Sequence, residues 1–166
     1  MYRSRDFYLK GIYNVKGKKL GIIKDLYIDF NSGMVKGFKV NNMSLLSKKS
    51  YGDIEDIINI DEDIIIEKLI DKEGLKFSDI KGMDVIDKFG NSRGVVDDIL
   101  IDEDDFFIKG IIITSGLIDK MIKGKEIVLI NRSLLAEDYI LYLGEPNIVV
   151  KNIPHEMNRY EYCEKA

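Results

Sequence analysis

Apolar and polar side chains alternate most clearly over residues 20–30, where the pattern predicts one long β-strand. Lys24 interrupts the apolar series, and an interruption of this kind predicts a β-bulge or a strong bend. A glycine turn precedes the strand and the polar turn 31–33 follows it, so the chain is expected to return as a second strand over residues 34–40. The apolar face of the long strand is expected to contain Leu20, Ile22, Leu26, Ile28 and Phe30.

The same pattern occurs again 73 residues further along the chain, so residues 17–40 correspond to residues 90–113. Asp97 stands where Lys24 interrupts the first copy, and Val95, Ile99 and Ile101 repeat its apolar face. Glycine in the middle of each returning strand predicts a bend or a close approach of the neighbouring backbone. The positions shared by the two copies are Gly17, Gly21, Asp25, Asp29 and Gly37 in the first and Gly90, Gly94, Asp98, Asp102 and Gly110 in the second.

Beyond these hairpins the two copies are offset by 75 residues, which indicates an insertion of about two residues in the second copy. A helical turn capped by Asp53 is predicted over residues 53–58, with its counterpart at residues 132–135. The segment 71–81 joins the copies and is expected to pack through its apolar side chains. The chain therefore divides into repeat 1 (1–72), repeat 2 (73–147) and a tail (148–166), in which Pro154 is expected to open a C-terminal helix.

Both copies resemble the PRC-barrel family, a small β-barrel module. The resemblance rests on the run Gly-x-x-x-Gly-x-(Ile/Val)-x-Asp-(Leu/Ile)-x-Ile-Asp, followed by a turn and a glycine-containing strand. It implies an all-β protein of two small PRC-like β-barrels, formed by internal duplication and packed together, with short helical turns. Known members include the cytoplasmic subunit of bacterial photosynthetic reaction centres, the C-terminal domain of a ribosome-maturation factor and many stand-alone proteins. The resemblance thus implies a fold rather than an activity, and it transfers no catalytic residue.

Composition narrows the possible classes of protein. Apolar residues make up 45% of the chain and charged residues 33%, which is ordinary for a globular domain. Cys163 is the only cysteine, so neither an intrachain disulfide nor a cysteine-based metal cage is expected. We also expect no membrane span, because no window approaches 18 consecutive apolar residues, and no signal peptide. A cytoplasmic, bacterial-type protein is the resulting expectation.

Few residues along the chain are candidates for catalysis or metal binding. Asp25 and Asp98 are tempting as an acid pair, but a strand carboxylate next to turns more often accepts backbone hydrogen bonds. The acidic turns 61–63 and 102–105 lack the ligand spacing of a calcium loop. His155 is the only histidine, so a His-rich metal site is not expected. We therefore predict no enzyme activity, no cofactor and no metal.

Binding to a partner remains the main functional hypothesis. The first possibility is an adaptor that recognises a protein of unknown identity. The alternative is an RNA- or ribosome-associated factor that binds through lysine patches, although the net charge of −4 argues against a dedicated nucleic-acid binder. The lysines that the barrel fold would have to bring together are Lys16, Lys18, Lys19, Lys48, Lys49, Lys120, Lys123 and Lys125. The sequence does not determine the oligomeric state.

Overall fold

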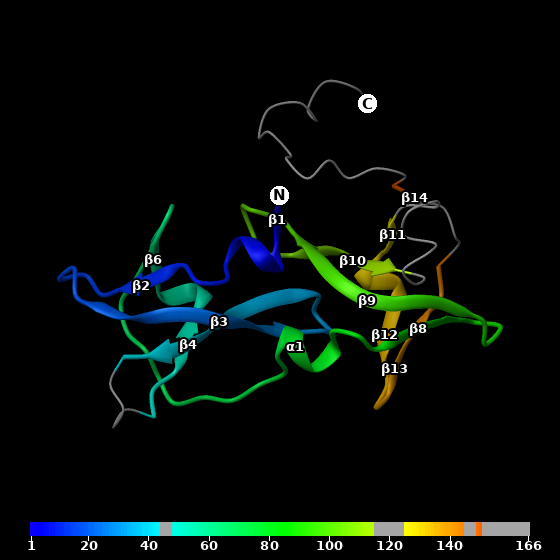
Figure 1. The fold of residues 1–166 in the computed structure, drawn as a ribbon, viewed down its shortest axis with the longest axis horizontal. Coiled ribbons are helices and arrows are strands. Elements are labelled where there is room, and N and C mark those ends of the chain that lie inside the picture. Colours follow the sequence, from blue (N-terminus) through cyan, green and yellow to red (C-terminus); the bar gives the residue numbers. More distant parts are fainter. Residues whose placement is uncertain (44–47, 115–124, 145–148, 151–166) are drawn as a thin grey trace, which may run out of the picture.

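The computed structural model describes residues 1–43, 48–114, 125–144 and 149–150. Their architecture is all-β, as predicted, and the strands form two sheets. Figure 1 shows the sheet of repeat 1 on the left and that of repeat 2 on the right. The expected C-terminal helix, with His155 and Cys163, lies outside the described residues.

The sheet of repeat 1 has six strands. Their spatial order is β5 (Tyr51–Asp53), β4 (Met34–Asn42), β3 (Lys19–Asp29), β2 (Gly11–Tyr13), β7 (Ile64–Ile66) and β6 (Ile57–Ile60). The 3-10 helix η2 (Ile54–Asp56) connects β5 to β6. Asp53 caps this helix by accepting a hydrogen bond from the backbone N–H of Glu55, as the sequence predicts.

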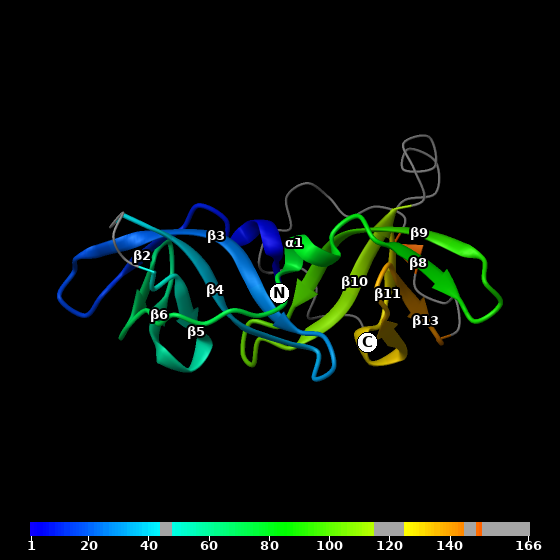
Figure 2. The same ribbon diagram turned by 90° about the horizontal axis from the view of Figure 1, so that it is seen from below.

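The sheet of repeat 2 has eight strands, of which seven form a continuous path. Their order is β12 (Ser133–Leu135), β13 (Tyr139–Tyr142), β8 (Asp84–Asp87), β9 (Ser92–Ile101), β10 (Ile108–Thr114), β11 (Lys125–Val128) and β14 (Val149–Val150). The 3-10 helix η3 (Ile130–Arg132) connects β11 to β12, as η2 does in repeat 1. Seen from below in Figure 2, the loops that precede β3 and β9 lie at opposite ends of the molecule.

The predicted interruptions are β-bulges in both repeats. The register of β3 against β4 shifts between Ile23 and Asp25, and that of β9 against β10 shifts between Val96 and Asp98. Each bulge reverses the alternation of side chains, so the residue before it faces inward. Ile23 and Val96 are therefore the core residues, and the prediction that Ile22 and Val95 face the core was wrong.

The second half of each repeat also corrects the alignment. The helices η2 and η3 are 76 residues apart, so the insertion amounts to three residues rather than two. The turn predicted at residues 132–135 is also misplaced, because the helix η3 ends at Arg132 and Ser133–Leu135 is the strand β12. In repeat 1 the predicted turn 53–58 ends earlier than expected, because strand β6 begins at Ile57.

A pseudo-twofold axis relates the repeats where their long hairpins meet. Met34 of β4 lies opposite Phe107, its counterpart in repeat 2, in an antiparallel bridge. The backbone N–H of Val35 donates to the carbonyl of Phe106 at 3.0 Å, and the N–H of Ile108 donates to that of Gly33 at 2.7 Å. The two sheets are therefore joined edge to edge by their hairpins.

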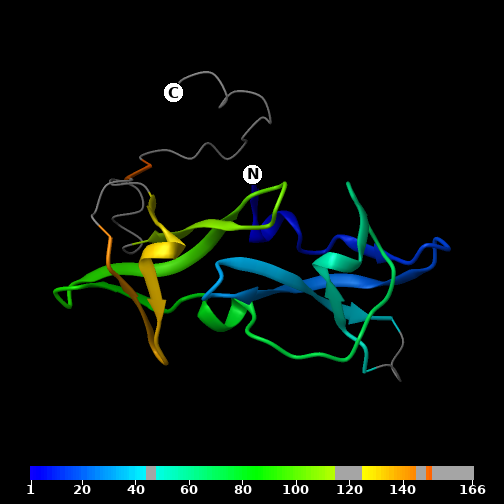
Figure 3. The same ribbon diagram turned by 180° about the vertical axis from the view of Figure 1, so that it is seen from behind.

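Each repeat also sends its first residues across this junction onto the long strand of the other. Strand β1 (Tyr2–Arg3) pairs with the end of β9, and its residues lie opposite Ile101 and Leu100. In the reverse direction, the N–H of Ile28 in β3 donates to the carbonyl of Leu75 at 2.9 Å. The short helices η1 (Ser4–Asp6) and α1 (Phe77–Ile80) follow these segments and start 73 residues apart. Figure 3 shows both helices at the junction from behind.

Candidate interaction surfaces

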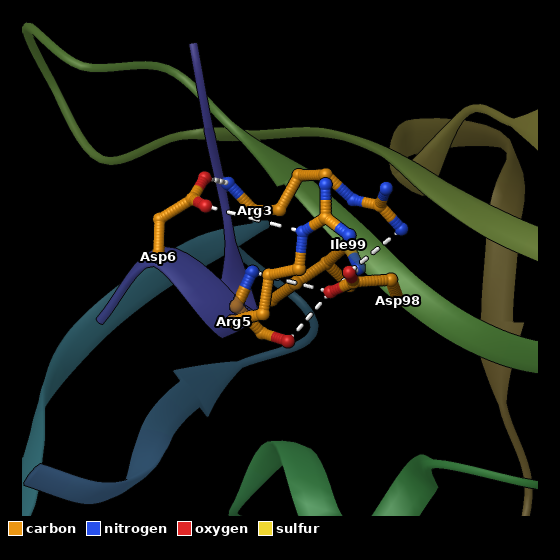
Figure 4. A network of polar contacts seen from close by, with 6 residues as sticks. Arg3, Arg5, Asp6, Asp98 and Ile99 are labelled. Atoms are coloured by element: carbon orange, nitrogen blue, oxygen red, sulfur yellow. Dashed lines mark hydrogen bonds and ion pairs between the residues drawn. The ribbon is translucent and has the colours of Figure 1, made fainter. Parts of the chain in front are cut away.

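Asp98 is the centre of a polar network at the junction, which Figure 4 shows from close by. Its Oδ2 atom lies 2.8 Å from Nη2 of Arg3, and the two side chains are only 7% and 11% exposed. Its Oδ1 atom accepts hydrogen bonds from the hydroxyl of Ser4 at 2.5 Å and from the N–H groups of Ser4 at 3.1 Å and Ile99 at 2.9 Å. The carboxylate of repeat 2 is thus saturated by the N-terminal residues of repeat 1.

Asp25 occupies the equivalent place in repeat 1 with a simpler set of partners. It is 6% exposed and accepts hydrogen bonds from the N–H of Leu26 at 2.8 Å and of Ser78 at 3.3 Å. Within the described part of the chain no cation pairs with it. The two aspartates therefore bind the start of the opposite repeat, and only Asp98 does so with an ion pair.

Tyr8 lies near both buried carboxylates. Its pKa is raised chiefly by burial of the phenol, while a hydrogen bond with Ser4 lowers it and the charges of Asp25 and Asp98 raise it further. The phenol is consequently neutral at physiological pH. The half-buried phenol of Tyr8 thus lies beside the Ser4 hydroxyl, and both carboxylates accept hydrogen bonds from the start of the opposite repeat.

The turn aspartates Asp29 and Asp102 lie at the ends of β3 and β9. Asp29 accepts hydrogen bonds from the N–H groups of Asn31 and Ser32, and Asp102 from that of Asp104. The pKa of Asp29 is lowered mainly by its hydrogen bonds to Ser32, and the pKa of Asp102 by its bond to the backbone of Asp104. Both carboxylates therefore hold turns. Among the described residues no group of three or more His, Cys, Asp or Glu side chains is placed to hold a metal ion.

The glycines shared by the two repeats either lie in turns or allow a neighbouring strand to approach closely. Gly17 and Gly90 have φ values of 74° and 83° in the loops before the long strands, and Gly94 has a φ of 135°. A Cβ atom at Gly21 or Gly37 would collide with the backbone oxygen of Asn41 or Gly52. At Gly110 it would lie 2.5 Å from a methyl group of Ile127.

The described candidate lysines lie in both repeats. Lys16, Lys18 and Lys19 lie in the loop before β3 and at its start, and all three are exposed. The Asn42 side chain donates to the carbonyl of Lys49 at 2.9 Å, which brings Lys48 and Lys49 to the same end of repeat 1. Lys125 begins β11 in repeat 2, and Lys120 and Lys123 lie outside the described residues.

A shallow hollow of about 590 Å³ opens on the outer face of repeat 1. Its floor includes the row Asn59–Ile65–Tyr13 across β6, β7 and β2, and its rim includes the acidic loop 61–63. Lys19 lies over the ring of Tyr13, 5.6 Å from its centroid. This face is therefore mixed in polarity and charge.

The equivalent face of repeat 2 carries a row of apolar side chains, with the exposed Asp84 beside Tyr139. Leu134 of β12 lies opposite Leu141 of β13, which lies beside Ile86 of β8. Ile140 and Tyr142 point into the core, so the alternating neighbours Tyr139 and Leu143 share the outer side with Leu141. Leu134 is 55% exposed, Leu143 45% and Tyr139 40%. We call these five outward side chains, Ile86, Leu134, Tyr139, Leu141 and Leu143, the apolar row.

Sequence reasoning did not identify the apolar row or the residues around Asp98. The row depends on the register of three strands from separate parts of the chain. Arg3 and Ser4 had a signal that was overlooked, because both repeats begin with a cation followed three residues later by an aspartate. Arg3 and Lys76 each donate a hydrogen bond from their backbone N–H to the side chain of Asp6 or Asp79.

Comparison with known proteins agrees with the resemblance seen in the sequence. The family model described as PRC-barrel domain matches the chain twice, over residues 1–73 and 72–141. The two matches meet in the segment that joins the repeats. No curated protein matches the chain. Among the described residues, no helix has the length and apolar character needed to cross a membrane.

Proposed function

The chain belongs to the PRC-barrel family, and from this premise we propose that it is a non-enzymatic adaptor that binds a protein partner through the apolar row of repeat 2. The exposure of this row is the observation that carries the proposal. Contiguous apolar side chains on a sheet face are unfavourable in water, and such patches commonly mark protein interaction sites. The buried centre of an interface is more apolar than its rim, and tyrosine is enriched in interfaces.

The comparison of the two repeats supports the same proposal. Both repeats place three strands in the same arrangement, β12–β13–β8 in one and β6–β7–β2 in the other. In repeat 1 the central row is Asn59–Ile65–Tyr13, whereas in repeat 2 the outer row contains Leu134, Leu141 and Ile86. Repeat 1 therefore has the polar Asn59 opposite Ile65, where repeat 2 has Leu134 opposite Leu141.

A matched pair of substitutions tests this surface. Leu134→Asp is expected to reduce recovery of the partner at least tenfold, because a carboxylate in a desolvated interface loses its hydration. Ile58 lies 76 residues before Leu134, the offset between η2 and η3, and is equally exposed, at 55%, so Ile58→Asp is the control and should leave recovery unchanged. The measurement is affinity purification from the native host followed by quantitative mass spectrometry.

The free energy of unfolding of both variants is expected to lie within about 0.5 kcal/mol of the wild-type value, since surface substitutions have small effects on stability. Equal recovery of the partner by wild type and Leu134→Asp would contradict the proposed surface.

A second candidate function is RNA or ribosome association at the lysine-bearing end of repeat 1. The observation in its favour is that five of the eight candidate lysines, residues 16, 18, 19, 48 and 49, lie at one end of the molecule. The acidic loop 61–63 lies at the same end, since Nζ of Lys10 contacts the carbonyl oxygen of Asp61. This candidate comes second because basic and acidic residues lie together at this end of repeat 1, and surfaces of mixed charge are ordinary.

On this alternative, the protein is expected to retain RNA at about 50 mM salt and to lose most of it at about 200 mM, because binding to phosphates releases counterions. Lys48→Glu with Lys49→Glu should abolish retention, whereas Lys81→Glu with Lys88→Glu, the same charge change in repeat 2, should not. Filter binding with a labelled RNA pool measures this. Absence of RNA from the low-salt sample removes the candidate.

A further inference from the structure

The first eight residues form an N-terminal arm that is bound mostly by the opposite repeat. Met1 forms an ion pair with Glu103 at 2.9 Å, Tyr2 and Arg3 pair with β9, and Ser4 bonds to Asp98. Met1 is 56% exposed, and Figure 1 shows the N-terminus at the outer edge of the junction. We call β9 residues 98–101, which bind this arm, the arm seat.

The arm is joined to its own repeat through a strained residue. Leu9 has a φ of 69°, a left-handed conformation that is unfavourable for a residue with a Cβ atom. Its counterpart 73 residues later is Gly82, which adopts a φ of 86° without this penalty. The N–H groups of Leu9 and Gly82 make equivalent bonds, to the carbonyls of Ile23 and Val96. The leucine side chain is 75% exposed, so its packing does not offset the strain.

The two exchanged segments of the molecule differ in what holds them. The segment around Leu75 follows Ile70, which is paired with Tyr51 of β5. The first four residues of the N-terminal arm instead contact the opposite repeat. A rotation of the chain at Leu9 would move the arm off its seat and remove the left-handed strain at that residue.

We propose that the arm seat also binds the N-terminal arm of a second copy of this chain, so that two molecules form an arm-exchanged dimer with Leu9 as the hinge. The exchanged arm makes the same contacts with β9 and Asp98 as the molecule's own arm, so the seat needs no new complementarity. Association costs rigid-body entropy, and release of two strained Leu9 hinges offsets part of this cost. The exchange is independent of the apolar row, which lies on strands β8, β12 and β13 and the residue that follows β13.

Two singly labelled chains test the exchange directly. One carries Tyr2→Cys and the other Ile101→Cys, each with Cys163→Ser so that no other thiol remains. Because residues 2 and 101 lie directly opposite each other in the register, cysteines there are within disulfide reach only when an arm occupies the seat. After the reduced proteins are mixed at high concentration and then oxidised, a disulfide between position 2 of one chain and position 101 of the other is expected. Peptide mass spectrometry identifies it.

The control is one chain that carries both cysteines and Cys163→Ser. Oxidised alone at high dilution, it locks the arm in its own seat and should give no intermolecular disulfide when it is then concentrated. If the mixed chains yield no disulfide between positions 2 and 101, the proposal is wrong. An equal yield of the intermolecular disulfide from the locked control would overturn it as well, because the link would then form without exchange.

A second measurement avoids cysteine substitution in the core. Leu9→Gly removes the hinge strain, whereas Leu9→Ala removes the same exposed side chain and keeps the strain. Analytical ultracentrifugation of the otherwise unmodified chain should show a dimer fraction about fivefold lower for Leu9→Gly than for Leu9→Ala. A purely monomeric Leu9→Ala protein at high concentration, or equal dimer fractions in both variants, overturns the assignment of Leu9 as the hinge.

Discussion

Replacing Asp98 by alanine is expected to lower the free energy of unfolding by about 3–5 kcal/mol, because it leaves the buried guanidinium of Arg3 without its counter-ion. The Arg3 side chain is 11% exposed, and its Nε atom is already buried without a hydrogen-bond partner among the described residues. The substitution also removes the acceptor of the hydroxyl and the N–H of Ser4. Urea denaturation followed by circular dichroism measures the loss.

Asp25→Ala is the matched control for this experiment. It removes the equivalent carboxylate from repeat 1, where the partners are two backbone N–H groups and no described cation, so we expect a smaller loss of about 1–3 kcal/mol. Adding Arg3→Met to Asp98→Ala should restore part of the stability, because the uncompensated charge is then absent. Equal losses for the two aspartates, with no recovery in the double variant, would show that the ion pair contributes nothing.

Gly37→Ala is expected to cost about 3 kcal/mol, since the added methyl group collides with backbone that has no freedom to move away. Its Cβ would meet the carbonyl oxygen of Gly52 and lie 2.8 Å from the ring of Tyr51. That ring is 1% exposed, and its hydroxyl donates to the carbonyl of Lys36 at 2.9 Å. The carbonyl of Gly52 and the ring of Tyr51 are therefore both held in place.

Gly110→Ala is the control at the equivalent position of repeat 2. Its Cβ would mainly meet a side-chain methyl group of Ile127, which can rotate, and would lie 3.2 Å from the carbonyl oxygen of Val128. We expect a cost of about 1–2 kcal/mol, measured by thermal and urea unfolding of the two variants in parallel. A larger loss for Gly110→Ala than for Gly37→Ala would show that strand β5 adjusts more readily than Ile127.

Local pattern was sufficient to predict the duplicated hairpin and its bulges, because the periodicity and the turn residues lie close together in the sequence. The same bulges made the inside–outside assignment of Ile22 and Val95 wrong, since a strict alternation cannot be continued across an extra residue. Strand β12 was missed because its residues 133–135 were assigned to the helical turn that ends at Arg132.

The junction and the apolar row were beyond sequence reasoning for a different reason. Ser4 and Asp98 are 94 residues apart, and nothing in the local sequence of either residue identifies the other as its partner. The apolar row likewise combines Ile86 with Leu134 and Leu141, whose proximity follows from the parallel pairing of β8 with β13. Pairings of this length are set by the packing of the whole fold rather than by periodicity.

The exchanged arm also has a consequence for biosynthesis. Its carboxylate partner is made 94 residues after Ser4, so the arm stays without its binding site until much of repeat 2 has been synthesised. Until then Arg3 and the ring of Phe7 are only partly buried. Phe7 packs against Phe38 of repeat 1 and also against Phe106 of repeat 2. The arm precedes the rest of repeat 1 in the chain, yet it is expected to become ordered only after β9 has been made.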